Sequence, residues 1–183
     1  MLGRHGTVDD MATTSTALIQ LSTVLGGRKL LVQSLSASEE MGRLFEFNVS
    51  ALTEDKALDP SKLLGSHATV ALELPSGKVR HFDGIVTAAG LDGAHGRYLR
   101  HRLVLRPWLW LATRRSDFKI FQDMTVPDIV QDVLGKYGHP LSKKLTRAYR
   151  NRPYTVQYNE SDYLFIARLC ESEGIYWYFA HDK

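Results

Sequence analysis

The side chains that could perform acid–base, nucleophilic or metal chemistry are present in this chain of 183 residues, but their spacing does not suit that chemistry. Glu171 and Glu173 stand two residues apart on a predicted helix, so they point to different sides and cannot form an acid–base pair. Glu160 and Asp162 fall in the first turn of that helix, where carboxylates interact favourably with the helix dipole. We therefore expect structural carboxylates, with Arg168 and Glu171 forming a surface ion pair.

The other common chemical motifs are also missing from the sequence. None of the 7 histidines repeats at zinc-ligand spacing, no glycine-rich phosphate loop occurs, and no serine lies in a G-x-S-x-G elbow. The one cysteine, Cys170, cannot form an intramolecular disulfide, and its helical pattern predicts a buried, inert thiol. The sequence therefore predicts no catalytic residue, no cofactor, no metal ligand and no enzyme. A metal site assembled from distant histidines stays an alternative, and His81 and His101 are candidates for neighbours across strands.

Charge is unevenly distributed along the chain, whose formal net charge is +3 and whose pI is about 9.0. Residues 136–152 carry only basic charges, whereas residues 160–173 are mostly acidic. This favours a solvated basic loop beside an acidic helix, with an oriented contact to another subunit as the alternative. No apolar run approaches the ~20 residues that span a bilayer, and residues 1–16 lack the apolar core of a secretory signal. Neither a membrane span nor a signal peptide is predicted.

Further basic residues lie on a predicted strand, where Arg100, Arg102 and Arg106 alternate with leucines. Together with Arg97 and Tyr98, this strand could act as a basic β platform for nucleic acid. Only one aromatic ring shares that face, so nucleic-acid binding is the less favoured class. Another use for such a strand is contact with an acidic partner, with these strand arginines as possible interface residues.

The elements that position these residues begin with a β-rich first half. Apolar and polar residues alternate over residues 45–51, 68–74 and 97–106, which is the period of half-buried strands. Gly26 and Gly27 predict an early hairpin, residues 75–78 a turn, and residues 91–94 a second hairpin. Asp59 should cap a short helix over residues 60–64, which Gly65 ends. About six short strands favour a small antiparallel barrel over residues 17–110, because closure removes strand edges.

After Pro107 the hydrophobic period changes from that of strands to that of helices. Thr125 should cap a helix with Asp128 at the capping-box position, and Gly138 should end it. The junction at residues 108–110 is predicted to staple the two halves together. Residues 1–16 are predicted to be a disordered leader.

The last third of the chain predicts a strand, a helix and a second strand. Residues 152–158 alternate, and Asn159 or Ser161 caps a helix that runs to Glu173. Gly174 provides a left-handed exit into residues 175–180, a strand that is buried on both sides or waits for a partner. Residues 111–183 are thus predicted to form an α+β unit with two amphipathic helices.

The segment VQYNESDYLFIARLCESEGIYWYF at residues 156–179 resembles the most recognisable part of the VgrG family, the valine–glycine repeat proteins of type VI secretion. Upstream motifs follow in the family's order: R-x-F-x-G at residues 80–84, LVLRPWLW at 103–110 and IFQ at 120–122. The resemblance covers about residues 18–183. It also extends to the hub proteins of contractile phage tails and the phage late-control D proteins.

The matching positions are assigned as family-motif or packing residues. They are Arg80, Phe82, Gly84, Pro107, Trp108, Phe121, Gln157, Tyr158, Glu160, Arg168, Glu173 and Gly174. Trp177 joins the strand arginines as a possible interface residue, because aromatic residues and arginine are enriched at interface centres. Aromatic residues of the second half, Tyr154 and Tyr178 among them, exceed what so small a unit can bury, so some should be exposed.

The resemblance implies an α+β fold, with a small antiparallel tube-like β barrel followed by an α+β insertion unit. It implies the N-terminal hub region of a spike protein that trimerises, caps and nucleates the hexameric secreted tube, contacts baseplate components and delivers effectors on contraction. The protein would lie in the bacterial cytoplasm during assembly and then be secreted or injected by the type VI apparatus.

The family's second barrel, neck and needle have no counterpart here, which predicts a truncated or unusually short chain. A hub protein of a contractile phage or phage-like tail is the alternative within the same class. A basic nucleic-acid-binding barrel is the alternative from another class.

Overall fold

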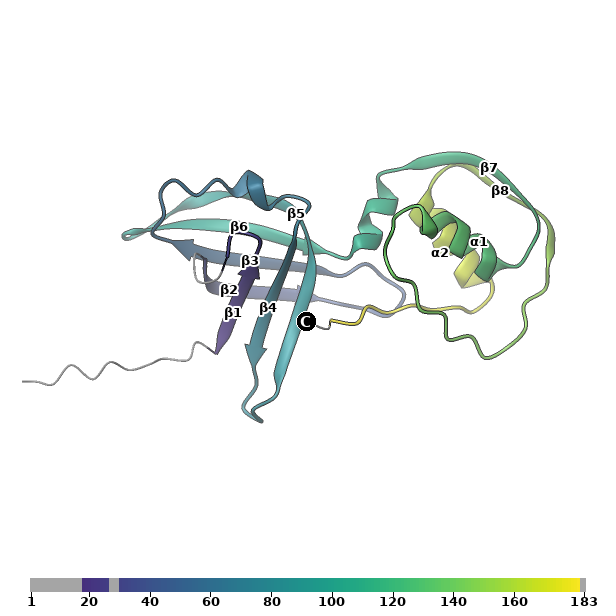
Figure 1. The fold of residues 1–183 in the computed structure, drawn as a ribbon. Coiled ribbons are helices and arrows are strands. Elements are labelled where there is room, and N and C mark those ends of the chain that lie inside the picture. The colour runs from purple at the N-terminus through teal and green to yellow at the C-terminus, as the bar shows by residue number, and fades with distance from the viewer. Residues whose placement is uncertain (1–17, 27–29, 182–183) are drawn as a thin grey trace, which may run out of the picture.

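The computed structural model describes residues 18–26 and 30–181, so the predicted disordered leader at residues 1–16 lies outside the described residues. The first half forms one curled antiparallel sheet of six strands in the order β1-β4-β5-β6-β3-β2 (Figure 1). The strands are β1 (Ile19–Thr23), β2 (Leu31–Ser38), β3 (Glu46–Thr53), β4 (His67–Glu73), β5 (Val79–His95) and β6 (Tyr98–Arg106). The described part of the chain is therefore mostly β.

The predicted alternation is confirmed on the strands that carry the core. On β3, Phe47, Val49 and Ala51 are fully buried, while the residues between them are half-buried. Phe45 stacks on Phe47 with ring centroids 4.3 Å apart, and Phe82 meets Phe47 edge-on at 5.3 Å. Period-2 burial and aromatic packing thus hold the concave face of the sheet together.

The predicted β5–β6 hairpin is present, but its turn lies later than predicted. Residues 91–94 do not turn, because β5 continues to His95 and pairs there with Tyr98. Gly93, with φ 98°, lies in an irregularity of the ladder between Leu91 and Ala94, and the reversal comes at Gly96, with φ 61°. The glycine at 93 thus marks a bulge in the ladder and not a turn. A bulge and a tight turn both place a glycine at positive φ, which is why one was mistaken for the other.

Among the described residues, the strands on either side of Gly26 do not pair as the predicted early hairpin would require, because β1 pairs with β4 and β2 pairs with β3. Gly27, its other glycine, lies outside the described residues. Within the part of the chain that the structure describes, β1 and β2 do not pair with each other, so hydrogen bonds do not close the sheet into a full barrel.

The predicted pairing of His81 with His101 across strands is wrong. His81 lies opposite Ala71, and His101 lies opposite Ala51 and Leu91.

Shorter predictions in this half hold. The turn at residues 75–78 is closed by a hydrogen bond from Leu74 N to the Lys78 carbonyl, at 2.8 Å. A 3-10 helix, η1 (Pro60–Leu63), begins where Asp59 accepts a hydrogen bond from Ser61 N at 2.9 Å. Its Leu63 is fully buried in the sheet's core, so η1 closes one opening of the curled sheet.

The second half is a smaller unit, called here the helical unit: η2 (Trp108–Thr113), β7 (Ser116–Met124), α1 (Val126–Gly135), β8 (Arg152–Ser161) and α2 (Asp162–Ser172). β7 and β8 form an antiparallel two-stranded ribbon, and the two helices lie against it (Figure 1). Phe121 of β7 stacks on Phe165 of α2 at 5.4 Å inside a second core.

The predicted helix caps are present. Thr125 accepts a hydrogen bond from Asp128 N at 3.3 Å, and Ser161, rather than Asn159, accepts one from Leu164 N at 3.2 Å. Asn159 instead has φ 49° at an irregularity in the β7–β8 ladder. The first helix ends at Gly135, earlier than predicted, and Gly138 follows with φ 69°.

Residues 174–181, called here the strap, return from α2 to the first sheet. The predicted strand at residues 175–180 joins no ladder, yet its side chains alternate: Ile175, Trp177 and Phe179 are half-buried, whereas Tyr176 and Tyr178 are exposed. The Trp177 carbonyl accepts a hydrogen bond from Gly42 N at 2.8 Å. Figure 1 shows this yellow segment returning to lie beside β5, where Phe179 packs against both cores.

Candidate assembly surface

The outer face of β6 carries the strand arginines, and each is held by neighbours in the same sheet. Arg100 donates to the Asp92 carbonyl at 2.9 and 3.1 Å and pairs with the Asp92 carboxylate at 3.1 Å. Arg106 donates to Thr87 Oγ1 at 2.8 Å and to the Glu46 carboxylate. Two of the three predicted interface arginines are therefore neutralised within the chain.

Arg102 differs from its neighbours because it is exposed and its one side-chain hydrogen bond goes to a neutral group, Asn48 Oδ1, at 2.9 Å. Asn48 in turn donates to Glu46 at 2.9 Å, and the hydrogen bonds from Asn48 and Arg106 lower the pKa of Glu46. Arg102 thus keeps a positive charge that no carboxylate of the described residues pairs with. It is the strand arginine most available to a partner.

The R-x-F-x-G residues on β5 pack the sheet. A Cβ built on Gly84 would stand 2.9 Å from the carbonyl oxygen of Arg106 on the neighbouring strand, closer than such atoms approach in proteins. Phe82 is buried, and the Arg80 guanidinium lies 4.7 Å from its ring centroid. Gly84 therefore allows a close backbone approach, because β5 and β6 meet there without room for a side chain.

The junction between the halves is built around two tryptophans. Pro107, with φ −66°, leads into η2, where Trp108 stacks on His139 at 4.9 Å and borders the second core. The guanidinium groups of Arg106 and Arg114 lie 5.5 and 5.6 Å from the ring centroid of Trp110. These contacts agree with the predicted staple between the two halves.

A buried polar network inside the helical unit was missed by the sequence analysis. The Asp162 carboxylate is fully buried and receives hydrogen bonds from Gln157 Nε2 and Tyr137 OH, both at 2.7 Å, and an ion pair from Lys136 Nζ at 2.8 Å. Burial alone would raise the pKa of Asp162, but these three donors outweigh it and lower that pKa. Burial and the neighbouring carboxylate raise the pKa of Tyr137.

The predicted pair of Arg168 with Glu171 is wrong. Arg168 donates to both Glu160 oxygens at 2.9 and 3.0 Å and to the Val156 carbonyl at 2.8 Å. Glu160 lies where β8 ends, so Arg168 ties α2 back to the ribbon. A fork-shaped guanidinium favours this bidentate partner over a single contact along the helix.

Glu173 and Gly174 anchor the exit from α2. The Glu173 carboxylate accepts from Arg152 at 2.7 Å and from Arg147 at 3.2 Å, and Gly174 takes the predicted left-handed φ of 65°. Part of the basic segment is therefore paired with the acidic helix of its own chain.

The outer face of the β7–β8 ribbon is aromatic and exposed. Tyr158 is 75% exposed and Phe118 is 64% exposed, and their rings meet edge-on at 5.2 Å. Ile120 and Tyr154 on the same two strands are also exposed. Trp177, by contrast, is half-buried against the second core and meets Tyr163 edge-on. The expected exposed aromatic residues of the second half are thus present.

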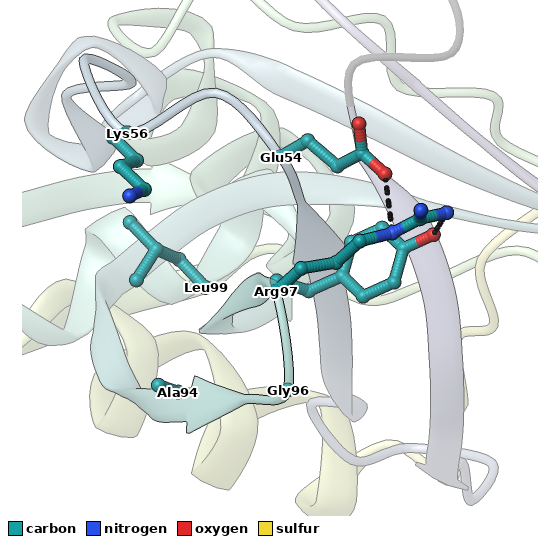
Figure 2. A pocket seen from close by; sticks show the side chains of 7 residues that line it. Glu54, Lys56, Ala94, Gly96, Arg97 and Leu99 are labelled. Atoms are coloured by element: carbon teal, nitrogen blue, oxygen red, sulfur yellow. Dashed lines mark hydrogen bonds and ion pairs between the residues drawn. The ribbon is translucent and has the colours of Figure 1, made fainter.

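The rim of the sheet at the β5–β6 hairpin holds a shallow hollow of about 430 Å³ (Figure 2). Arg97 pairs there with Glu54 at 2.9 Å and donates to the Tyr98 hydroxyl at 2.9 Å. Figure 2 shows the Arg97 side chain bridging these two groups, with Lys56 and Leu99 set apart from them. The Arg97 and Glu54 charges in this hollow pair with each other, as is usual on a solvated surface.

Among the described residues, no group of three metal-ligating side chains comes together, and no helix is both long and apolar enough to cross a bilayer. Cys170 is buried, as predicted, and burial raises the pKa of its thiol to about 11.

Residues 38–183 match the family model of the phage tail baseplate hub (GPD). The chain belongs to the phage tail baseplate hub family. Among curated relatives of this hub chain, the type VI secretion system spike proteins VgrG1b and VgrG1a of Pseudomonas aeruginosa are each 41% identical over 169 residues. These matches cover 92% of the hub chain but 23% and 26% of the relatives, so it spans about a quarter of their length.

Solved structures agree with the family. The hub chain is similar to the E. coli c3393 protein, a component of the type VI secretion system with structural similarity to the T4 bacteriophage tail proteins gp27 and gp5. The TM-score is 0.70 at 26% identity, covering 84% of the hub chain and 45% of that chain. The prophage MuSo2 43 kDa tail protein from Shewanella oneidensis has the same fold, with a TM-score of 0.59 at 15% identity over 85% of the hub chain and 50% of its own.

These matches confirm the predicted VgrG resemblance and the predicted place among spike and tail-hub structural proteins. Most of the motif residues of this hub chain lie inside the fold or tie its elements together. Tyr158 is the exception among them, because its side chain points to solvent.

Proposed function

We propose that the chain is a structural hub element of a type VI secretion spike and carries no enzymatic activity. The observation that carries this proposal is the match of residues 38–183 to the hub family, together with the 41% identity to spike proteins. The buried carboxylate Asp162 supports it too, because its hydrogen-bond partners hold it ionised inside the core, away from solvent and from any substrate.

The proposed architecture divides the chain at its junction. Residues 17–110 form a tube-like barrel domain and residues 111–183 an α+β unit, and copies of the chain trimerise so that their barrels form a ring. The curled sheet, whose six strands already bend around one core, supports this ring. Such a ring would cap and nucleate the hexameric secreted tube.

The proposed partners are the tube protein, baseplate components and, on contraction, effectors. We place Arg102 at the contact with the tube, flanked by Arg100 and Arg106, because its exposed charge can pair with an acidic partner. Trp177 would contribute indirectly, because it packs against the second core and so holds the strap in place beside the first sheet. Assembly would take place in the bacterial cytoplasm, followed by secretion through the type VI apparatus; a hub of a contractile phage or phage-like tail is the alternative.

Nucleic-acid binding remains the weaker candidate. The arginines of a nucleic-acid platform must be free for phosphates, whereas Arg100 and Arg106 are each paired with a carboxylate of their own sheet.

The test is sedimentation velocity of the chain mixed with the purified hexameric tube protein of the same bacterium. We expect co-sedimentation that Arg102→Glu weakens at least about tenfold, while Lys78→Glu, an exposed lysine in the β4–β5 turn, leaves it unchanged. A chain that ignores the tube protein but binds a single-stranded oligonucleotide in a salt-dependent way would overturn the proposal.

A further inference from the structure

The segment between α1 and β8 is basic, and its lysine and arginine side chains are largely exposed to solvent. Residues 139–151, called here the basic loop, contain neither helix nor strand, and most of them are exposed. The loop is anchored at both ends: His139 stacks on Trp108, and Arg147 and Arg152 bind Glu173. Long loops without secondary structure are uncommon in compact units and are usually functional.

Three cations of this loop have no counter-ion among the described residues. Lys143, Lys144 and Arg150 are exposed and form no ion pair with any carboxylate of residues 18–26 and 30–181. Their neighbour Arg147 shows the contrast, because it is engaged by the Glu173 carboxylate at 3.2 Å. The loop therefore presents a cluster of unpaired positive charge on a pinned backbone.

A complementary groove lies where the strap crosses the β2–β3 turn. It is a hollow of about 490 Å³ lined by Glu39, Glu40, Met41, Tyr176 and Tyr178. Glu39 is shared by His181 at 3.0 Å and Arg80 at 3.9 Å, whereas Glu40 is exposed and joins no ion pair among the described residues. A free carboxylate beside two exposed tyrosine rings suits a lysine or arginine, by charge and by cation–π contact.

The backbone of the groove also lacks partners. Within the described ranges, the N–H groups of residues 176–180 donate no hydrogen bond, although this stretch is extended and its side chains alternate. Such an edge accepts an extended segment through main-chain hydrogen bonds. The groove thus offers both a charge match and a backbone match to an extended basic segment.

We propose that the basic loop of one copy lies in this groove of the next copy, and that this head-to-tail contact carries the self-association on which the proposed function rests. Figure 1 shows the loop running along the lower edge of the helical unit, from the side near η2 to the far side where β8 begins, while the strap leaves towards the first sheet. Two different, complementary patches on one chain make a heterologous contact, which is the kind that closes rings.

The first test uses a fluorescein-labelled peptide of residues 141–151 and fluorescence anisotropy with the whole chain. We expect saturable binding that Glu40→Lys weakens at least about tenfold and that Tyr178→Ala also weakens. Glu73→Lys, an exposed carboxylate at the end of β4 without an ion pair among the described residues, is the matched control and should bind normally. A peptide with glutamate at 143 and 144 should not bind wild type but should recover binding to Glu40→Lys.

A second measurement tests the contact between whole chains. Under mild oxidation, a mixture of Glu40→Cys and Lys144→Cys chains should form a crosslinked pair that neither variant forms alone, because Cys170 is buried and does not compete. Absence of peptide binding, or equal binding by Glu40→Lys and Glu73→Lys, overturns the inference. The tube-protein sedimentation decides the proposed function separately, since it reports on the Arg102 face and not on the groove.

Discussion

A buried histidine in the first sheet should make the fold sensitive to acid, and replacing it should relieve that sensitivity. His101 on β6 is 2% exposed, and neither ring nitrogen has a hydrogen-bond partner among the described residues. Burial lowers the pKa of His101 below its ordinary value of 6.5. We expect His101→Leu to stabilise the chain, because leucine has a similar volume and no unmet polar group.

The magnitude follows from the two unpaired nitrogens and the shifted pKa. A buried polar group without a partner costs about 1–3 kcal/mol, so His101→Leu should gain about 1–2 kcal/mol near pH 8 after some loss in packing. Below pH 6.5 the His101 imidazole is protonated in the unfolded chain but still neutral in the folded chain. The wild-type free energy of unfolding therefore falls as the pH falls towards the folded-state pKa of His101. The slope for one histidine is at most about 1.4 kcal/mol per pH unit.

The assay is urea unfolding of both proteins at about pH 8, 6 and 5, with the free energy of unfolding extrapolated to water. The advantage of His101→Leu should grow as pH falls. Burial also lowers the pKa of His139, but that residue is present in both proteins, so its contribution cancels in the difference. An advantage that stays constant from pH 8 to pH 5, or a leucine variant that is less stable throughout, would refute the reasoning.

Three further outcomes are expected. Gly84→Ala should lower the free energy of unfolding in urea by about 1–3 kcal/mol, because the new Cβ would meet the Arg106 carbonyl oxygen at 2.9 Å. The control Gly90→Ala, whose Cβ has nothing within 4 Å, should be nearly neutral, and equal effects of the two would count against the close approach. Asp162→Asn should cost about 1–3 kcal/mol, because the buried amide loses the charged hydrogen bonds to Lys136, Tyr137 and Gln157, and Lys136 keeps only the more distant Asp117 at 4.0 Å. The loss should shrink as acid protonates the wild-type carboxylate, and exposed Glu171→Gln is the control. Phe179→Ala should speed hydrogen exchange in both cores, since its ring packs against each, and exchange confined to one core would contradict this.

Local patterns in the sequence predicted local structure well. The alternation around Phe47, the cap at Thr125 and the left-handed exit at Gly174 each depend on residues close in the chain, and all three are present. The turn predicted at residues 91–94 failed because a glycine in a ladder irregularity and a glycine in a hairpin share the same backbone requirement. Sequence alone does not distinguish these two uses.

The missed features depend on contacts that no local pattern encodes. β7 was not predicted as a strand, because Phe118 and Ile120 on its outer face are as apolar as Phe121 on its inner face, which hides the alternation. The Asp162 network was hidden because its lysine and tyrosine both come from the turn after α1. Inward-facing Gln157 on β8 was the local sign of it. The VgrG resemblance succeeded because it rests on the order of several motifs at once.

The strap's contacts with the first sheet also constrain how this chain is made. His181 hydrogen-bonds to Glu39 and lies against Asp83, 142 and 98 positions earlier in the chain. On the ribosome, the strands that hold Phe45 and Phe47 are synthesised long before the phenylalanine that covers them emerges. Until Phe179 emerges, the first core therefore lacks a side chain that packs against it, so the first sheet cannot complete its packing from its own strands alone.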